Sequence, residues 1–227
     1  MNYTYKDIIN SYSEEKKLSD RNHHFILFLI YRPLSFPLTW LSLKLNIKPN
    51  YITLLTIIIS IFLIFLFQSD FILYKYIACL LMFIFLILDC VDGNIARTTK
   101  KSNKLGEFLD LFSGLLFWSV IFPSISIGLN NNEIIFMEYK FILIHIGYSI
   151  PILFLFSRFI SQQTKKIIGD NIYVVEKLFP IPILILNSFF DLVPIIYLIS
   201  LYNSSVDVFL YIYFIYILSA ILFILFN

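Results

Sequence analysis

The sequence LDCVDGNIAR at residues 88–97, followed by GEFLDLFSG at residues 106–114, places charged groups inside the most apolar part of the chain. Three of these groups are the carboxylates of Asp89, Asp92 and Asp110. Ionisable side chains at membrane depth are costly and normally face a polar cavity, so they indicate a functional site. Asp89 and Asp92 are three residues apart, which makes them neighbours on one face of a helix. A second helix that carries Asp110 can bring a third carboxylate against them.

Three clustered carboxylates repel one another unless cations lie between them. Carboxylate oxygens are hard ligands that suit Mg²⁺, Mn²⁺ or Ca²⁺. The spacing therefore predicts that Asp89, Asp92 and Asp110 hold divalent metal ions that meet a phosphate substrate, and Mg²⁺ or Mn²⁺ is the expected cofactor. Glu107 lies one turn before Asp110. It either faces the same cavity or interacts favourably with the positive end of its helix.

The stretch resembles the motif of the CDP-alcohol phosphatidyltransferase family, D-x2-D-G-x2-A-R-x8-G-x3-D-x3-D. Seven of its eight positions match in residue type and spacing over 26 residues, namely Asp89, Asp92, Gly93, Ala96, Arg97, Gly106 and Asp110. The eighth position, where the family has its fourth aspartate, is Gly114. The sequence Pro-Asn-x-Ile-Thr at residues 49–53 also looks like the entry to the first helix of this family. The resemblance covers residues 32–114.

The resemblance implies a reaction and a set of substrates. The chain would transfer a substituted phosphate group from CDP-diacylglycerol or a CDP-alcohol to an acceptor alcohol, with release of CMP, in phospholipid or related lipid biosynthesis. The three aspartates would bind the metal ions. The residues that would hold the CDP moiety are Gly93, Ala96, Arg97 and Gly106. The family also implies a homodimer, and the acceptor alcohol is not identified.

The base that activates the acceptor hydroxyl is the missing part of the motif. By resemblance this base is the fourth aspartate, and Gly114 offers no proton acceptor in its place. Ser113 points about 100° away in an ideal helix. Asp191 is a candidate substitute base, the alternative being a polar residue that forms hydrogen bonds between helices. Arg158 either binds a phosphate or carboxylate of the acceptor or extends from its helix end to the membrane interface.

The composition indicates a membrane protein and a single membrane domain. Of 227 residues, 59% are hydrophobic and only 14% are charged, which excludes a soluble globular protein, and a net charge of +2 gives no indication of nucleic-acid binding. A membrane-spanning helix needs about 20 apolar residues. Six candidate spans follow, at 50–68, 72–96, 105–129, 139–160, 178–201 and 207–226. The expected fold is therefore all-α, a polytopic membrane protein with six transmembrane helices over residues 49–227.

Residues 1–48 are predicted to form a cytoplasmic N-terminus and an interfacial helix that precedes the first span. Residues 25–47 are apolar, but Arg32, Pro33, Pro37 and Lys44 interrupt every window of spanning length. Such a segment is expected to lie in the interface rather than to cross the membrane. Arg32 is expected to bind anionic lipid headgroups there.

The basic residues predict the orientation. Fifteen of the 17 lie in segments 1–48, 97–104 and 158–177, against only Lys75 and Lys140 in the alternate loops. Because positive residues are retained on the cytoplasmic side, both termini and the 97–104 loop are expected in the cytoplasm. The three aspartates then lie near the cytoplasmic face, as expected for a multi-pass protein of a bacterial cytoplasmic membrane.

Three functions are compatible with these residues. The first is the transferase described above. The second is a non-catalytic relative that binds nucleotide or lipid but lacks the base. The third is a cation transporter that uses the same carboxylates as an ion relay. Glycines beside the aspartates favour a nucleotide cavity over a transport path, although small residues also serve close helix packing in membranes.

Overall fold

The computed structural model describes residues 3–101, 103–129, 137–168 and 188–226. Within these ranges every regular element is a helix. In chain order they are α1 (Tyr5–Ser11), α2 (Glu14–His23), the π-helical turn η1 (Leu27–Tyr31), α3 (Arg32–Lys44), α4 (Pro49–Gln68), α5 (Ile72–Thr99), α6 (Lys104–Ile127), α7 (Met137–Ile168), α10 (Val193–Tyr202) and α11 (Val206–Phe226). The all-helical expectation is confirmed for this part of the chain.

Four helices are long and apolar enough to cross a membrane. They are α4, α5, α6 and residues 139–157 of α7, and they coincide with the first four predicted spans. α10 has only 10 residues, and the described apolar part of α11 ends at Leu222. The fifth predicted span begins at residues that lie outside the described ranges. The total of six spans therefore stays a prediction.

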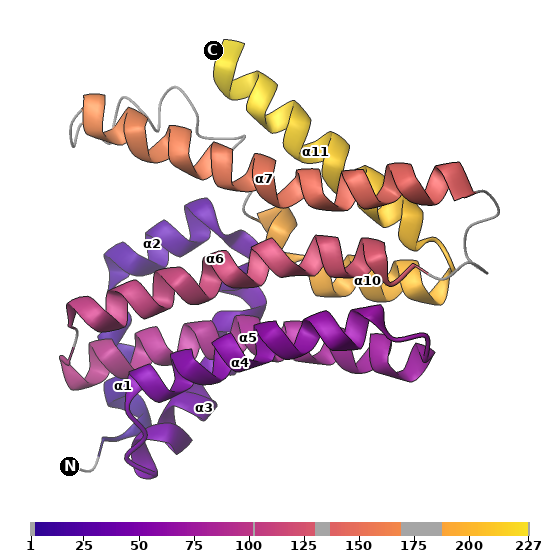
Figure 1. Ribbon diagram of the computed structural model, residues 1–227. Helices are drawn as coiled ribbons and strands as arrows, with labels where there is room; N and C mark the ends of the chain where they lie inside the picture. Colours follow the sequence, from indigo (N-terminus) through magenta and orange to yellow (C-terminus); the bar gives the residue numbers. More distant parts are fainter. Residues whose placement is uncertain (1–2, 102, 130–136, 169–187, 227) are drawn as a thin grey trace.

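The long helices lie side by side and run alternately in opposite directions (Figure 1). α4 packs against both α5 and α6, and α6 packs against α7. One end of the bundle holds the start of α4 and the loop between α5 and α6, whereas the turn between α4 and α5 lies at the other end. The two helix ends that carry the predicted aspartates are thus brought together.

Local signals set these helix ends. α4 starts with Pro49 in its first turn, where the missing N–H is not needed. α5 ends at Thr99, and the left-handed φ of 54° at the next residue, Lys100, stops the helix. The side chain of Asn103 caps α6 by accepting a hydrogen bond from the N–H of Gly106 at 2.6 Å. A short loop between two defined ends holds α5 and α6 in one arrangement.

Two glycines allow the closest approaches between the long helices. A Cβ at Gly128 would overlap the carbonyl oxygen of Phe67, at the end of α4. A Cβ at Gly147 would overlap the side chain of Ser126, across the contact between α6 and α7. Small residues of this kind let membrane helices pack backbone against backbone.

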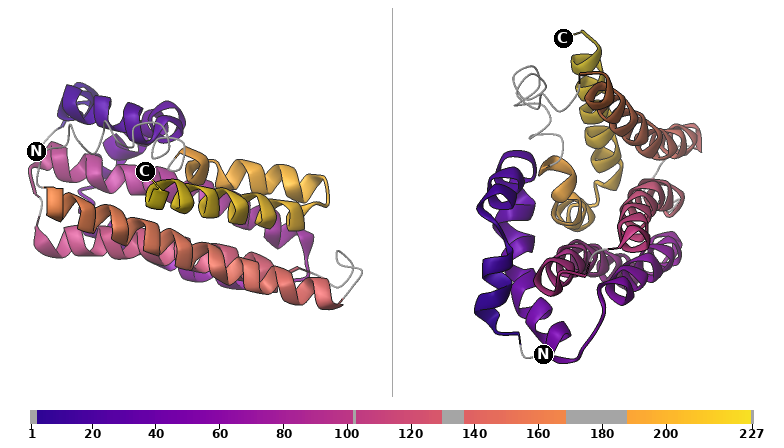
Figure 2. Two further views of the ribbon diagram at one scale, coloured as in Figure 1. Left: turned by 90° about the horizontal axis from the view of Figure 1, so that it is seen from above. Right: turned by 90° about the vertical axis from the view of Figure 1, so that its left-hand side faces the viewer.

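The N-terminal segment contains more structure than one interfacial helix. α1 and α3 both pack against α5, and the segment lies along one side of the bundle (Figure 2). α3 buries Ser35, Thr39 and Ser42. Its exposed apolar stripe consists of Leu34, Leu38 and Leu41, and it continues at Leu45 directly after the helix. Such a stripe suits contact with lipid at the interface, and the interfacial location stays a prediction.

The expectation that Arg32 binds lipid headgroups is wrong. The residue is only 6% exposed, and its Nε and Nη2 atoms donate to Oδ2 of Asp20 at 3.1 and 2.7 Å. Burial alone would raise the pKa of Asp20, but the charges of Arg32 and Lys16 outweigh it and hold that pKa below its ordinary value. Sequence reasoning missed the pair because the two residues lie on different helices.

Candidate active site

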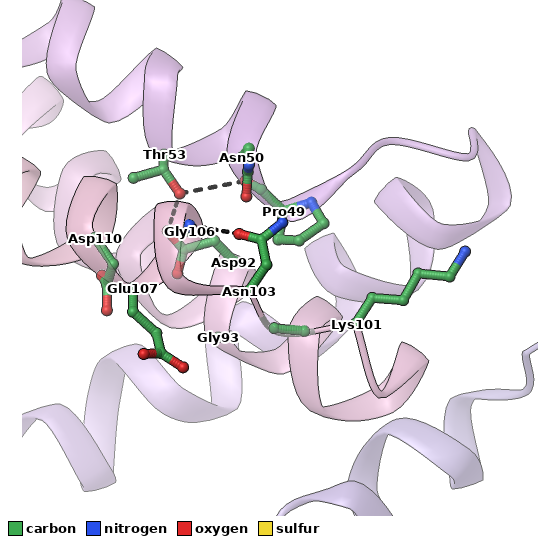
Figure 3. Close-up of a pocket in the computed structure, with 11 residues that line it drawn as sticks. Pro49, Asn50, Thr53, Asp92, Gly93, Lys101, Asn103, Gly106, Glu107 and Asp110 are labelled. Atoms are coloured by element: carbon green, nitrogen blue, oxygen red, sulfur yellow. Dashed lines mark hydrogen bonds between the residues drawn. The ribbon is translucent and has the colours of Figure 1, made fainter.

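The ends of α4, α5 and α6 enclose a pocket with about 420 Å³ of empty space, part of it open to solvent (Figure 3). Five of the seven matching motif positions line it. The full lining comprises Pro49, Asn50, Thr53, Asp92, Gly93, Ala96, Lys101, Asn103, Gly106, Glu107 and Asp110. The residues predicted to hold metal and nucleotide therefore converge mainly on one cavity.

Asp92 is the buried acid of this pocket. The residue is 5% exposed, and Oγ1 of Thr53 donates a hydrogen bond to Oδ2 of Asp92 at 2.7 Å. Asp89 and Asp110 both lie near enough for their negative charges to act on it. A buried carboxylate that faces two others is costly unless a cation or a proton compensates its charge.

Two further acids of the pocket come from the first turns of α6. Glu107 and Asp110 line the same cavity as Asp92 (Figure 3). Glu107 also lies in the first turn of α6, so both sequence interpretations of this residue hold. Glu107 therefore joins Asp92 and Asp110 as an acid that lines the pocket.

The glycines leave room for polar groups. A Cβ at Gly106 would lie 3.0 Å from Oδ1 of Asn50 and 3.1 Å from Oδ1 of Asn103. A Cβ at Gly93 would lie 3.2 Å from Nη1 of Arg97, so the guanidinium group rests over this glycine. These two small residues therefore shape the site in addition to easing helix packing.

Two matching motif residues, Asp89 and Arg97, are not among the lining residues of the pocket. Asp89 is half-buried and acts on Asp92 through its charge. Arg97 borders the pocket wall at Gly93 and donates from Nη2 to Oδ1 of Asn94 at 2.7 Å.

Gly114, which stands where the family has its base, is surrounded by open space. A Cβ built on Gly114 meets no atom within 4 Å, so this part of α6 has space for a larger side chain. Ser113 is buried, and its hydroxyl lies 2.7 Å from that of Thr56, with which it shares a hydrogen bond. The hydroxyl group of Ser113 is therefore engaged in a contact with α4.

The second candidate for the base, Asp191, is not among the residues that line the pocket. Asp191 is buried beside the N-terminal segment, where its Oδ2 lies 3.4 Å from Nδ1 of His24 and its main-chain oxygen accepts a hydrogen bond from Tyr31 at 2.7 Å. Arg158 belongs to α7, and its side chain lies outside the described part of the structure.

The donor set of the pocket suits a hard divalent cation in its chemistry. Asp92, Glu107 and Asp110 offer carboxylate oxygens, the ligands that Mg²⁺ and Mn²⁺ prefer. Among the residues that the structure describes, no three His, Cys, Asp or Glu side chains form a ready metal centre. The carboxylates share a cavity without forming a closed coordination shell.

Several lining residues were not foreseen as site residues. Thr53 and Asn50 belong to a sequence that was recognised only as a helix entry, and Asn103 acts as a cap. Thr53 and Asp92 are 39 positions apart, and no local pattern shows that their side chains meet. Only the contact between α4 and α5 brings them together.

Residues 46–225 match the sequence profile of CDP-alcohol phosphatidyltransferases. This chain belongs to the CDP-alcohol phosphatidyltransferase family. The family is one of phosphotransferases, which pass a phosphate group from a CDP-alcohol to an acceptor and generally depend on divalent metals. Membership and four long apolar helices together indicate an integral membrane protein. No match was found among curated proteins.

Proposed function

We propose that this member of the family transfers a substituted phosphate group from CDP-diacylglycerol or a CDP-alcohol to an acceptor alcohol, with release of CMP, in lipid biosynthesis. One observation carries the proposal. The pocket between α4, α5 and α6 gathers two of the motif aspartates with Gly93, Ala96 and Gly106. Acidic and small residues in one cavity suit a metal-bound pyrophosphate next to a nucleotide.

In this reaction the acceptor oxygen attacks the donor phosphorus that carries the alcohol group. The bond from that phosphorus to the CMP oxygen breaks, CMP leaves with the electron pair, and the hydroxyl proton passes to a base. Asp89, Asp92 and Asp110 would hold Mg²⁺ or Mn²⁺, and the bound ion would supply positive charge to offset the negative charge of the pyrophosphate. Thr53 keeps the carboxylate of Asp92 in one orientation through its hydrogen bond.

The nucleotide would lie along the small residues of the pocket. Gly93, Ala96 and Gly106 allow close approach to the backbones of α5 and α6. Arg97, which rests over Gly93, would bind a phosphate group through its guanidinium N–H groups. Lys101 adds a positive charge to the same cavity.

Fewer residues are candidates for binding and activating the acceptor alcohol. Because Gly114 cannot accept a proton, the proton has to pass to another group, and Asp191 is the candidate in this chain. Arg158 is the candidate for binding a phosphate or carboxylate of the acceptor. By the distribution of basic residues, the pocket and both termini lie on the cytoplasmic side.

A second candidate function is favoured by Gly114 alone. A relative without a base would bind the CDP-linked donor or its lipid and turn over slowly or not at all. The same carboxylates would serve a cation transporter, but a transporter gives no reason for the glycines that shape the pocket.

The proposal is tested by CMP release from the purified full-length protein in lipid vesicles, with Mg²⁺ or Mn²⁺ and a panel of acceptor alcohols. Release that requires both metal and acceptor, and that is lost in Asp92→Asn, is the expected result. Metal-dependent CMP binding without release would support the non-catalytic relative. Neither binding nor release with any donor would refute both.

A further inference from the structure

A buried polar network connects the N-terminal helices to the motif on α5. Asp20, Arg32 and Asn94 are all buried. Arg32 donates to Asp20 through Nε and Nη2 and to Oδ1 of Asn94 through Nη1, at 3.2 Å in the latter case. The same Oδ1 of Asn94 accepts a hydrogen bond from Nη2 of Arg97 at 2.7 Å. The network therefore runs from α2 to the arginine of the motif.

The amide group of Asn94 is held in one orientation. Its Nδ2 atom donates to Oγ of Ser35 at 2.8 Å and to Oγ1 of Thr39 at 3.2 Å, both on α3. Because the nitrogen faces two hydroxyl groups, the oxygen faces the two guanidinium groups. A buried polar group with this many partners has little freedom to turn.

Charge balance explains why Arg97 stays beside the pocket. The two guanidinium groups repel each other, and Asp20 is the carboxylate that compensates Arg32. Arg32 makes the hydrogen bonds to Asp20, whereas Arg97 makes its hydrogen bond to the neutral oxygen of Asn94 and lies against Gly93. Nε of Arg97 is buried and has no hydrogen-bond partner among the described residues. The guanidinium group thus keeps donor capacity beyond its bond to Asn94.

We infer that Asn94, Arg32 and Asp20 are positioning residues that hold Arg97 at the wall of the nucleotide pocket. The inference rests on the proposed function, because it assigns Arg97 a phosphate of the CDP moiety. Asp20 and Arg32 precede residues 46–225, the part of the chain that matches the family. The N-terminal helices therefore act on the donor site from outside the matched segment.

The test measures CMP affinity in the presence of Mn²⁺ by calorimetry on the detergent-solubilised full chain. Asn94→Ala should weaken CMP binding about 10- to 100-fold, the range expected when a charge-assisted hydrogen bond that places the guanidinium group is lost. Asn94→Asp keeps an oxygen acceptor for both arginines and should restore affinity to within a few-fold of the wild type.

Ser11→Ala is the matched control. The hydroxyl of Ser11 lies 3.0 Å from that of Thr98, so this variant removes another bond between the N-terminal helices and α5 without touching Arg97. It should bind CMP like the wild type. An equal loss in Ser11→Ala and Asn94→Ala would show that docking of the N-terminal helices matters rather than the placement of Arg97, and would overturn the inference.

Unchanged CMP affinity in a folded Asn94→Ala variant would also overturn the inference that Asn94 positions Arg97. If Asn94→Ala does not fold, the inference is tested with Arg32→Lys instead. A lysine at this position can keep the ion pair with Asp20 but not the hydrogen bond to Asn94. Weaker CMP binding in Arg32→Lys than in Ser11→Ala supports the inference, and equal binding refutes it. A wild-type protein that binds no CMP would instead refute the proposed function itself.

Discussion

Asp92 shows how one side chain combines structural and chemical demands. It is buried, accepts a hydrogen bond from Thr53 and faces the charges of Asp89 and Asp110. Apolar surroundings make such a charge expensive, whereas a divalent cation would make it favourable. A carboxylate at this position therefore destabilises the fold without a cation and is suited to binding a metal ion.

At this scale we expect Asp89→Asn to weaken Mn²⁺ binding by at least about 10- to 100-fold, since even changes to outer-shell partners of a metal cost this much. Mn²⁺ titration followed by electron paramagnetic resonance measures the affinity without requiring turnover. Asp70→Asn is the control, because Asp70 is exposed and precedes the start of α5. Wild-type affinity in Asp89→Asn would remove Asp89 from the proposed metal site.

Gly114→Asp is expected to raise the rate of CMP release if the base is simply missing. The new side chain has space, since a Cβ there meets no atom within 4 Å. General-base assistance contributes about 10²–10⁴-fold to a rate, so a restored base would be readily measured. The measurement is single-turnover CMP release with excess donor and Mn²⁺.

Gly114→Asn separates the base from the shape of the side chain, because it is nearly isosteric with aspartate and cannot take the proton. It should release CMP at the rate of the wild type. If Asp191 already serves as the base, Gly114→Asp adds little and Asp191→Asn abolishes release while sparing donor binding. Robust wild-type release that survives Asp191→Asn would contradict both accounts.

At the scale of helices, the site depends on where three elements begin and end. Asn103 caps α6, Lys100 ends α5, and Pro49 starts α4. Each signal is local, but the pocket exists only because α4 packs against both other helices. The close contact between Gly128 and the carbonyl group of Phe67 fixes the distance between α4 and α6 at the opposite end of the bundle.

We therefore expect Gly128→Ala to lower the thermal stability of the protein. The added Cβ would overlap the backbone of Phe67, which cannot move aside like a flexible side chain. Overpacking of this kind costs about 1–3 kcal/mol. Thermal unfolding in detergent, followed by intrinsic fluorescence, measures the effect.

Gly114→Ala is the control for this substitution, because it makes the same change inside α6, the helix that Gly128 follows, at a position with open space. It should leave stability unchanged or raise it slightly through better helix propensity. Equal melting temperatures for the two variants would show that the helices separate easily and that the contact at Gly128 is unimportant.

At the scale of the whole molecule, the pocket lies at the end of the bundle that also holds the basic loop between α5 and α6. The loop between α5 and α6, the start of α4 and the N-terminal helices all lie at the end that carries the pocket (Figure 1). The turns between α4 and α5 and between α10 and α11 lie at the other end. Positive residues favour the cytoplasm, so the pocket end is expected to be cytoplasmic.

Cysteine labelling of intact cells tests this orientation. In a background without the buried residues Cys79 and Cys90, Lys101→Cys should react with a membrane-impermeant maleimide only after the cells are opened. Tyr202→Cys, at an 81% exposed position at the end of α10, should react from outside in intact cells. The reverse pattern would invert the topology and rule out a cytoplasmic CDP-linked donor.

The sequence by itself determined the helical class, the first four long apolar helices and the family. Apolar runs of spanning length are a local property, and so is the spacing of aspartates and glycines along two helices. The motif also located five of the residues that line the pocket, because three- and four-residue spacings place side chains on one helix face.

Only the tertiary structure decided how these residues meet groups from elsewhere in the chain. Thr53 reaches Asp92 and Asp20 reaches Arg32 across helix contacts that no local pattern contains. Arg32 looked like a surface anchor because a basic residue followed by a proline in an apolar segment suits the interface. It is buried instead because Asp20 and Asn94 supply the charge and the hydrogen bonds that make burial favourable, and those partners come from α2 and α5.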